Sequence, residues 1–242
     1  LRDISLLFSK EGESVVEEIE KKKIAQCLWT HNICLCNNSI MELFDKNMYF
    51  IKIIRNPIFV INNYCNFLER FNSSKIFTPS FTINSDSLPW FTSEYKNQLD
   101  ISNNLETAII CIVNSYENYF QNRIIYKQEL KIEEISFENL VINTIDEVTK
   151  IEKFLNRKFD KKKLNKILKR QKIPRVNLIE GLESGTQKQS LKSFDFIPKN
   201  DQDYCKYMIN ILDGKISQSL FKRFLNIIEI YQNIFPFFKY KI

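Results

Sequence analysis

The sequence predicts a doubly wound α/β fold, in which a mostly parallel β-sheet carries helices on both faces. Three observations lead to this fold class: short apolar runs bounded by polar segments, apolar residues at helical spacing between these runs, and a strand that passes directly into a helix at Arg55-Asn56-Pro57. Strands that alternate with helices favour parallel pairing with helices on both faces. In such sheets, ligands bind beyond the carboxyl ends of the strands.

Two segments have the composition of buried parallel strands, residues 24–29 and 48–54, and residues 132–137 are predicted to form a third strand. The second segment is followed at once by residues 58–70, whose apolar side chains recur at helical spacing. Asn56 suits the N-cap of that helix and Pro57 suits its first position. The sequence therefore predicts a strand, a tight turn and a helix in immediate succession.

Helical spacing predicts further helices over residues 1–9, 13–22, 105–123, 145–156, 161–172 and 216–234. At the start of the helix over 145–156, Thr144 and Glu147 have the spacing of a capping box, and Ile145 is expected on its buried face. Residues 72–100, rich in Ser, Thr and Asn, are predicted to form a long loop or insertion. We expect a single domain over residues 1–242, closed by C-terminal helices within residues 186–242.

Composition narrows the function classes. The formal net charge of +6 permits an anionic ligand, and the lysine-rich stretch at residues 161–172 is expected to be a solvated helix face. The six cysteines show no Cys-x-x-Cys spacing, so we predict no metal site and expect free or buried thiols, which favours a reducing, cytoplasmic location. No apolar run reaches the roughly 18 residues that span a bilayer.

Four short motifs follow one another along the chain: Trp29-Thr30-His31, Arg55-Asn56-Pro57, Ile135 to Leu140, and Phe154-Leu155-Asn156. Together they resemble the sulfotransferase family, whose members show Lys-Thr-His, Arg-Asn-Pro, Tyr-Glu-Asp-Leu and Phe-Leu-Gly segments in this order. The resemblance covers roughly residues 1–185. It implies a P-loop NTPase-like fold and the transfer of a sulfuryl group from 3′-phosphoadenosine-5′-phosphosulfate to a hydroxyl or amine.

The resemblance also assigns roles to individual residues. It implies that His31 is the general base, a role that suits an imidazole with a pKa near neutrality. Arg55 would bind the 3′-phosphate of the cofactor, and a guanidinium beside a helix N-terminus is well suited to do so. Asn63 stands where the family usually has a serine, eight residues after Arg55. Arg175, followed by Gly181, resembles a cofactor-binding Pro-Arg segment with a spaced glycine.

Several positions depart from the family pattern. Trp29 stands where a lysine is common, and the chain contains no Gly-rich phosphate loop. Because Leu1-Arg2 resembles the residues just past that loop, we expect an N-terminally truncated domain that lacks the first strand and the loop, and a fragment that is itself inactive. Glu138 and Asn139 are interpreted as structural.

Two other functions remain open. The domain could be a non-catalytic relative that binds an anion or nucleotide, which the departures at Trp29 and Asn63 favour. A nucleic-acid-binding module, motivated by the basic residues 161–175, ranks last because that run lacks interleaved aromatic residues. The acceptor, a small molecule or carbohydrate, is expected to contact residues 72–100, and neither its identity nor the oligomeric state follows from the sequence.

Overall fold

The computed structural model describes residues 49–72, 80–83, 86–89, 103–179 and 198–236, together with Glu17 and Lys21. The chain divides into two compact units, Leu1–Ile33 and Cys34–Ile242, and every element named below belongs to the second. Glu17 and Lys21, inside the helix predicted over residues 13–22, are both helical. The helix predicted over residues 1–9 and the strand predicted over residues 24–29 lie outside the described residues.

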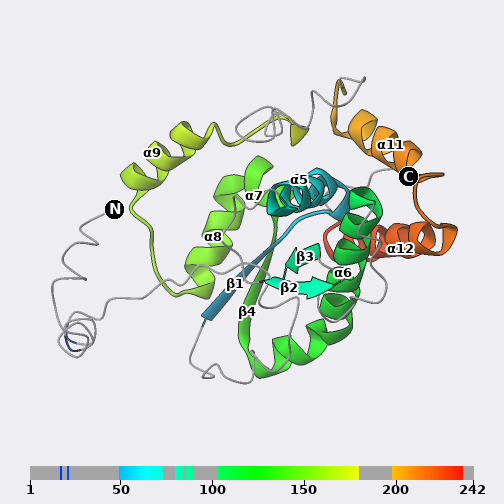
Figure 1. Ribbon diagram of the computed structural model, residues 1–242. Helices are drawn as coiled ribbons and strands as arrows, with labels where there is room; N and C mark the ends of the chain where they lie inside the picture. Colours follow the sequence, from blue (N-terminus) through cyan, green and yellow to red (C-terminus); the bar gives the residue numbers. More distant parts are fainter. Residues whose placement is uncertain are drawn as a thin grey trace. The chain divides into compact units, whose positions relative to one another are not determined.

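Within these ranges the structure is mostly helical, with one small parallel sheet and one hairpin (Figure 1). The strands are β1 (Tyr49–Ile54), β2 (Ser80–Ile83), β3 (Asp86–Pro89) and β4 (Lys131–Ser136). The helices are the 3₁₀ helix η1 (Pro57–Val60) and the α-helices α5 (Ile61–Asn72), α6 (Asn104–Glu129), α7 (Phe137–Ile142), α8 (Thr144–Phe154), α9 (Lys161–Gln171), α11 (Asp201–Leu212) and α12 (Gln218–Ile234). None of the described helices is long and apolar enough to cross a membrane.

Strands β1 and β4 form the parallel pair, in a register that sets Ile54 opposite Ser136. Parallel neighbours need a long crossover connection, and here it contains α5, the β2–β3 hairpin and α6. The residues that follow the strands, Arg55 and Phe137, therefore leave the sheet at the same end, the carboxyl end of both strands. The parallel pairing expected for the three predicted strands is confirmed for these two, and the strand predicted over residues 24–29 lies outside the described residues.

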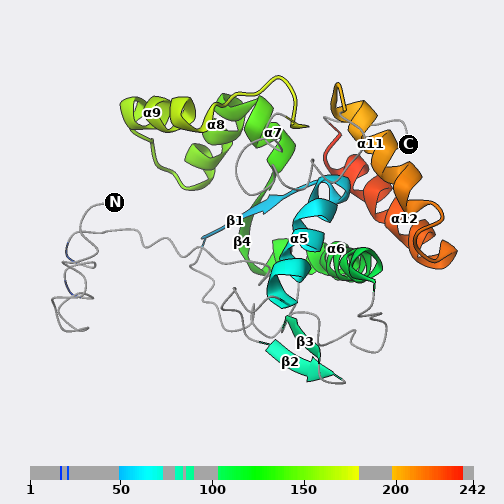
Figure 2. The ribbon, with the colours of Figure 1, turned by 45° about the horizontal axis from the view of Figure 1, so that its top comes forward.

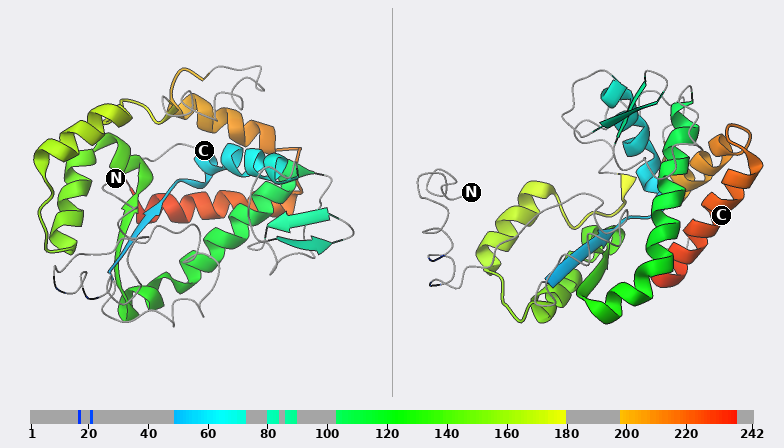
Figure 3. Two further views of the ribbon diagram at one scale, coloured as in Figure 1. Left: turned by 60° about the vertical axis from the view of Figure 1, so that its left-hand side comes forward. Right: turned by 60° about the horizontal axis from the view of Figure 1, so that its bottom comes forward.

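Helices lie on opposite faces of this pair. On β1, the Tyr49 ring meets Phe154 of α8 with a centroid distance of 5.4 Å. The Lys52 ammonium lies 3.4 Å from the centre of the Tyr119 ring of α6. Because side chains three positions apart on a strand point to opposite faces, α8 and α6 cover different faces of the sheet (Figure 3). This arrangement is the α/β layering that the sequence predicts.

The core lies where η1 and α5 meet α6 and α12 (Figure 2). Phe59, Ile109, Ile112, Phe224 and Ile228 are fully buried there, and each such side chain stabilises the fold by about 1.5–3 kcal/mol relative to exposure. The Phe59 ring also stacks on Tyr204 of α11, with centroids 5.2 Å apart. The predicted stripe of apolar residues along α12 thus supplies one wall of the core.

Two predicted apolar positions are more exposed than expected: Ile53 of β1 is 53% exposed and Ile145 of α8 is 55% exposed. The predicted capping box is also wrong. The Thr144 hydroxyl donates to a carbonyl oxygen of α7 at 2.7 Å, and the buried Glu147 pairs with Lys150 at 2.6 Å. A single residue separates α7 from α8, so Thr144 bonds back to the preceding helix instead of capping a free helix end.

The predicted long loop over residues 72–100 contains ordered secondary structure where it is described. Strands β2 and β3 pair antiparallel, with Ile83 opposite Asp86, and β3 contacts α5. Only two residues separate these strands, as in a tight hairpin. The polar composition that predicted a loop belongs in part to this short hairpin.

Candidate functional site

A buried carboxylate joins the carboxyl ends of β1 and β4. Glu138, at the start of α7, is 1% exposed. Its carboxylate accepts hydrogen bonds from the Asn56 backbone N–H at 2.9 Å, from the Ser136 hydroxyl at 2.9 Å and from the Tyr231 hydroxyl of α12. We call these four residues the Glu138 cluster. It fixes both strand ends and the final helix relative to one another.

Local sequence signals explain why both strands are followed directly by helices at their carboxyl ends. The Asn56 side-chain oxygen accepts from the Ile58 N–H at 3.0 Å, with Pro57 at the first helical position. Ser136 caps α7 by accepting from the Asn139 N–H at 3.3 Å. Polar N-caps after two neighbouring strands place two helix N-termini at the carboxyl end of the sheet. The predicted role of Asn56 is confirmed, although the helix starts as a 3₁₀ turn.

The Arg55 guanidinium lies in a half-buried, partly aromatic position without a counter-charge. Its central carbon is 4.7 Å from the centre of the Phe137 ring and 5.9 Å from that of Phe59. Its Nε is buried and has no hydrogen-bond partner, and no carboxylate among the described residues lies at ion-pair distance. Burial lowers the pKa of Arg55, and the nearby Glu138 partly opposes this. Since arginine stays protonated in proteins, an uncompensated positive charge remains.

Arg175 is a second cation near Arg55. It follows α9, and its backbone N–H donates to the Val141 carbonyl of α7 at 3.0 Å. Its charge is close enough to Arg55 to contribute to the lowered pKa of that guanidinium. Two like charges repel each other, and an anion bound between them would relieve both. The structure thus brings together two of the residues that the resemblance assigns to cofactor binding.

The other predicted site residues are placed as follows. Asn63 is a half-buried residue in the first turn of α5. His31, together with Trp29 and Thr30, lies outside the described residues. The sequence reasoning missed the aromatic contribution of Phe137 and Phe59, although Phe137 directly follows a predicted strand and Phe59 lies within the predicted strand-turn-helix.

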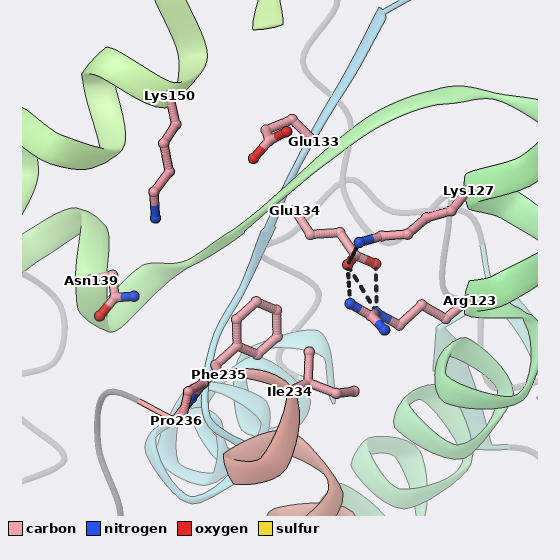
Figure 4. Close-up of a pocket in the computed structure, with 9 residues that line it drawn as sticks. All are labelled: Arg123, Lys127, Glu133, Glu134, Asn139, Lys150, Ile234, Phe235 and Pro236. Carbon is pink, nitrogen blue, oxygen red and sulfur yellow. Dashed lines mark hydrogen bonds and ion pairs between the residues drawn. The ribbon is translucent and has the colours of Figure 1, made fainter. Parts of the chain in front are cut away.

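A second polar cluster lines a pocket of about 490 Å³ beside β4 (Figure 4). Glu134 lies on one side of it with Arg123 and Lys127, whereas Glu133 lies near Lys150 on the other. Because consecutive strand residues point to opposite faces, a pocket that reaches both must lie at the edge of β4 that is not paired with β1. Ile234, Phe235 and Pro236 add an apolar wall.

The cations of this pocket already have partners. Glu134 forms ion pairs with Arg123 at 2.7 Å and with Lys127 at 2.6 Å, and it accepts a hydrogen bond from the Tyr119 hydroxyl. Burial alone would raise the pKa of Glu134, but the hydrogen bonds from Lys127, Tyr119 and Arg123 outweigh it and lower the pKa below its usual value. Lys150 pairs with Glu147. An anion is therefore better accommodated by Arg55 and Arg175 than by this pocket.

Replacing Tyr231 by Phe tests the Glu138 cluster. The substitution removes one donor from a buried carboxylate, so we expect the free energy of unfolding to fall by about 1.5–3 kcal/mol, the range for a hydrogen bond to a charged group. Tyr49→Phe is the control, because that tyrosine is 51% exposed, and a change within about 0.5 kcal/mol is expected there. Urea denaturation measures both variants. Equal stabilities would contradict the role given to Glu138.

Replacing Glu134 by Gln tests the ion network beside the pocket. We expect a loss of about 1–3 kcal/mol at neutral pH, less than for a wholly buried pair because Arg123 and Lys127 are partly exposed. A carboxyl whose pKa is lowered by folding stabilises the protein above its unfolded pKa, near 4.5, and this contribution is lost as the pH falls through the folded pKa.

The gap between wild type and Glu134→Gln should therefore shrink from pH 7 towards pH 3. Glu133→Gln is the control, because this neighbour has no ion pair among the described residues. Denaturation at a series of pH values measures the effect. A gap that stays constant across this range would show that Glu134 is not held ionised by its partners.

The comparisons with known proteins add no relative. No family model matches the chain, and searches of curated proteins and of solved structures find no match either. What supports a function is therefore the set of motifs and their geometry at the edge where β1 and β4 end.

Proposed function

We propose that the chain is a sulfotransferase-type domain with a doubly wound sheet. It would move a sulfuryl group from 3′-phosphoadenosine-5′-phosphosulfate to a hydroxyl or amine of a small-molecule or carbohydrate acceptor. The observation that carries this proposal is the pair of cations at the strand ends: Arg55, half-buried and without a carboxylate partner among the described residues, with Arg175 beside it.

The position of the motifs adds support. Arg55-Asn56-Pro57 and Ser136-Phe137-Glu138 lie at the carboxyl ends of neighbouring parallel strands. α/β sheets bind their ligands beyond these ends. Strands β1 and β4 each keep one edge without a partner among the described residues, so further parallel strands can extend the sheet on either side. A larger, doubly wound sheet with helices on both faces fits this arrangement.

In the proposed reaction, the acceptor oxygen or nitrogen forms a bond to sulfur while the bond from sulfur to the 5′-phosphate oxygen breaks. The acceptor's proton passes to His31. The products are the sulfated acceptor and adenosine 3′,5′-bisphosphate. Arg55 and Arg175 would hold the 3′-phosphate through charge-assisted hydrogen bonds, and the Asn63 amide could add a donor.

A non-catalytic anion-binding domain is the second candidate. Specific observations favour it: Trp29 and Asn63 replace a lysine and a serine of the family pattern, and the sequence contains no Gly-rich phosphate-loop motif. Such a domain would bind adenosine 3′,5′-bisphosphate through the same arginines without transferring a sulfuryl group. Binding and turnover therefore have to be measured separately.

Titration calorimetry with adenosine 3′,5′-bisphosphate tests the cation pair. Arg55→Ala should weaken binding by about 1.5–3 kcal/mol, roughly 10- to 150-fold, because it removes a charge-assisted contact to phosphate. Arg157→Ala is the matched control, since this arginine is exposed in the short segment between α8 and α9. Adenosine 5′-monophosphate, which lacks the 3′-phosphate, should bind wild type and Arg55→Ala equally. Equal affinity of both variants for the bisphosphate would remove Arg55 from the site.

Turnover tests the catalytic proposal. His31→Ala should lower transfer from phosphoadenosine phosphosulfate by roughly 10²–10⁴-fold, the range for losing a general base. The bisphosphate affinity should change little, because His31 would contact the acceptor. Labelled sulfate transfer to a panel of hydroxyl and amine acceptors measures the rate. Near-normal transfer by the variant would exclude His31 as the base, and Arg55-dependent binding without any transfer by wild type would favour the non-catalytic domain.

A further inference from the structure

Helix α9 presents an unusually dense set of positive charges to solvent. Seven of the twelve residues from 161 to 172 are Lys or Arg, and all seven are exposed. Of its apolar side chains, Leu168 is buried and Leu164 is half-buried. The solvated helix face that the sequence predicts is therefore present, and it occupies most of the helix circumference.

Few acidic groups neutralise this face. Among the described residues, one ion pair involves α9: Lys163 with Asp160, at 3.7 Å, and both side chains are largely exposed. An exposed pair of this kind contributes little. Asp160 also serves as the N-cap, accepting from the N–H groups of Lys162 and Lys163. The positive charge of the face therefore remains almost uncompensated.

The cations lie next to one another. Lys162, Lys166 and Arg170 are spaced four apart, so their side chains form one row along the helix. Like charges at this spacing destabilise an isolated helix by about 0.2–0.5 kcal/mol per pair. An anionic partner would turn this repulsion into attraction, which is a physical reason to look for one.

Exposed aliphatic side chains accompany the charges. Ile167 is 48% exposed, and it neighbours Lys163 and Arg170, which lie four and three positions away on the helix surface. Val176, just beyond the helix, is 83% exposed. On helices that lie in a membrane interface, Lys and Arg side chains line a polar face beside apolar side chains, and Ile167 is the apolar side chain of α9 that is exposed beside such cations.

We propose that the exposed face of α9, formed by Lys162, Lys163, Lys166, Ile167 and Arg170, binds the surface of an anionic lipid membrane. Clusters of four to eight Lys or Arg on an amphipathic helix suit the diffuse negative charge of anionic headgroups. Ile167 would enter the interface while the ammonium groups stay among the headgroups. The proposal does not rest on the sulfotransferase activity, because it uses none of the residues assigned to that site.

Nucleic acid fits this surface less well. Binding of single strands relies on stacking of bases on aromatic side chains, and α9 itself contains no aromatic residue. Six of the seven cations are lysines, whose point charges lack the bidentate geometry with which arginine binds individual phosphates. Exposed aliphatic side chains such as Ile167 and Val176 would also have no partner on a phosphate backbone.

Vesicle co-sedimentation of the whole chain tests the proposal. The vesicles contain phosphatidylcholine alone or with about one third phosphatidylserine, at about 0.1 M and about 1 M salt, where the screening lengths are about 10 Å and 3 Å. We expect binding to the anionic vesicles at low salt and its loss at high salt. The triple variant Lys162→Gln/Lys166→Gln/Arg170→Gln should bind on the order of 100-fold more weakly, from about 1 kcal/mol per cation.

A matched triple variant removes the same charge elsewhere. Lys206, Lys215 and Lys222 are exposed on or near α11 and α12, and their replacement by Gln should leave vesicle binding within a few-fold of wild type. Ile167→Ser keeps every charge but should weaken vesicle binding by roughly 10-fold, because it removes an apolar contact with the interface. Circular dichroism checks that each variant keeps its helices.

Three outcomes would overturn the proposal. The first is equal vesicle binding by the two triple variants, which would show that net charge and not α9 is responsible. The second is binding to phosphatidylcholine and to phosphatidylserine vesicles alike. The third is tighter, α9-dependent binding to RNA or DNA oligonucleotides than to anionic vesicles at equal phosphate concentration, with no effect of Ile167→Ser, which would identify a nucleic-acid surface instead.

Discussion

The buried carboxylate of Glu138 is the constraint on which the arrangement of the other elements depends. Burying an ionised carboxylate costs several kcal/mol unless its oxygens are hydrogen-bonded. Here the donors come from the end of β1, the end of β4 and from α12. Satisfying one charge therefore fixes three elements that are distant in the sequence. The position of Arg55, one residue before Asn56, follows from the same constraint.

Two carboxylates near the sheet, Glu134 and Glu138, are satisfied in different ways. Glu134 is surrounded by cations, so Arg123 and Lys127 are occupied. The Glu138 carboxylate instead accepts hydrogen bonds from a backbone N–H and from two hydroxyl groups, which are neutral donors. Its charge is still felt by Arg55, but no ion pair forms between them. The guanidinium is thus held near a negative charge without being neutralised by it, which leaves its donors available for a ligand.

Local signals explain what could be predicted from the sequence. Residues 48–54 were identifiable as a strand because they form a short apolar run that ends just before the polar N-cap at Asn56. The structure places this strand and the one predicted over residues 132–137 within one residue of those bounds. The β2–β3 hairpin was missed because its residues are polar, and the cap at Thr144 was mispredicted because α7 immediately precedes it. The approach of Arg175 to Arg55 depends on tertiary packing, and no local sequence pattern predicts it.

The long separation of the partners of Glu138 has a consequence for the growing chain. Asn56 lies 82 residues before Glu138, and Tyr231 lies 93 residues after it. At a synthesis rate of about 5–20 residues per second, β1 waits roughly 4–16 s for its neighbouring strand and a similar time again for α12. During this interval the edge of β1 that pairs with β4 is without that partner. Unpaired strand edges are prone to aggregation, so the length of the crossover between β1 and β4 sets how long this edge is exposed during synthesis.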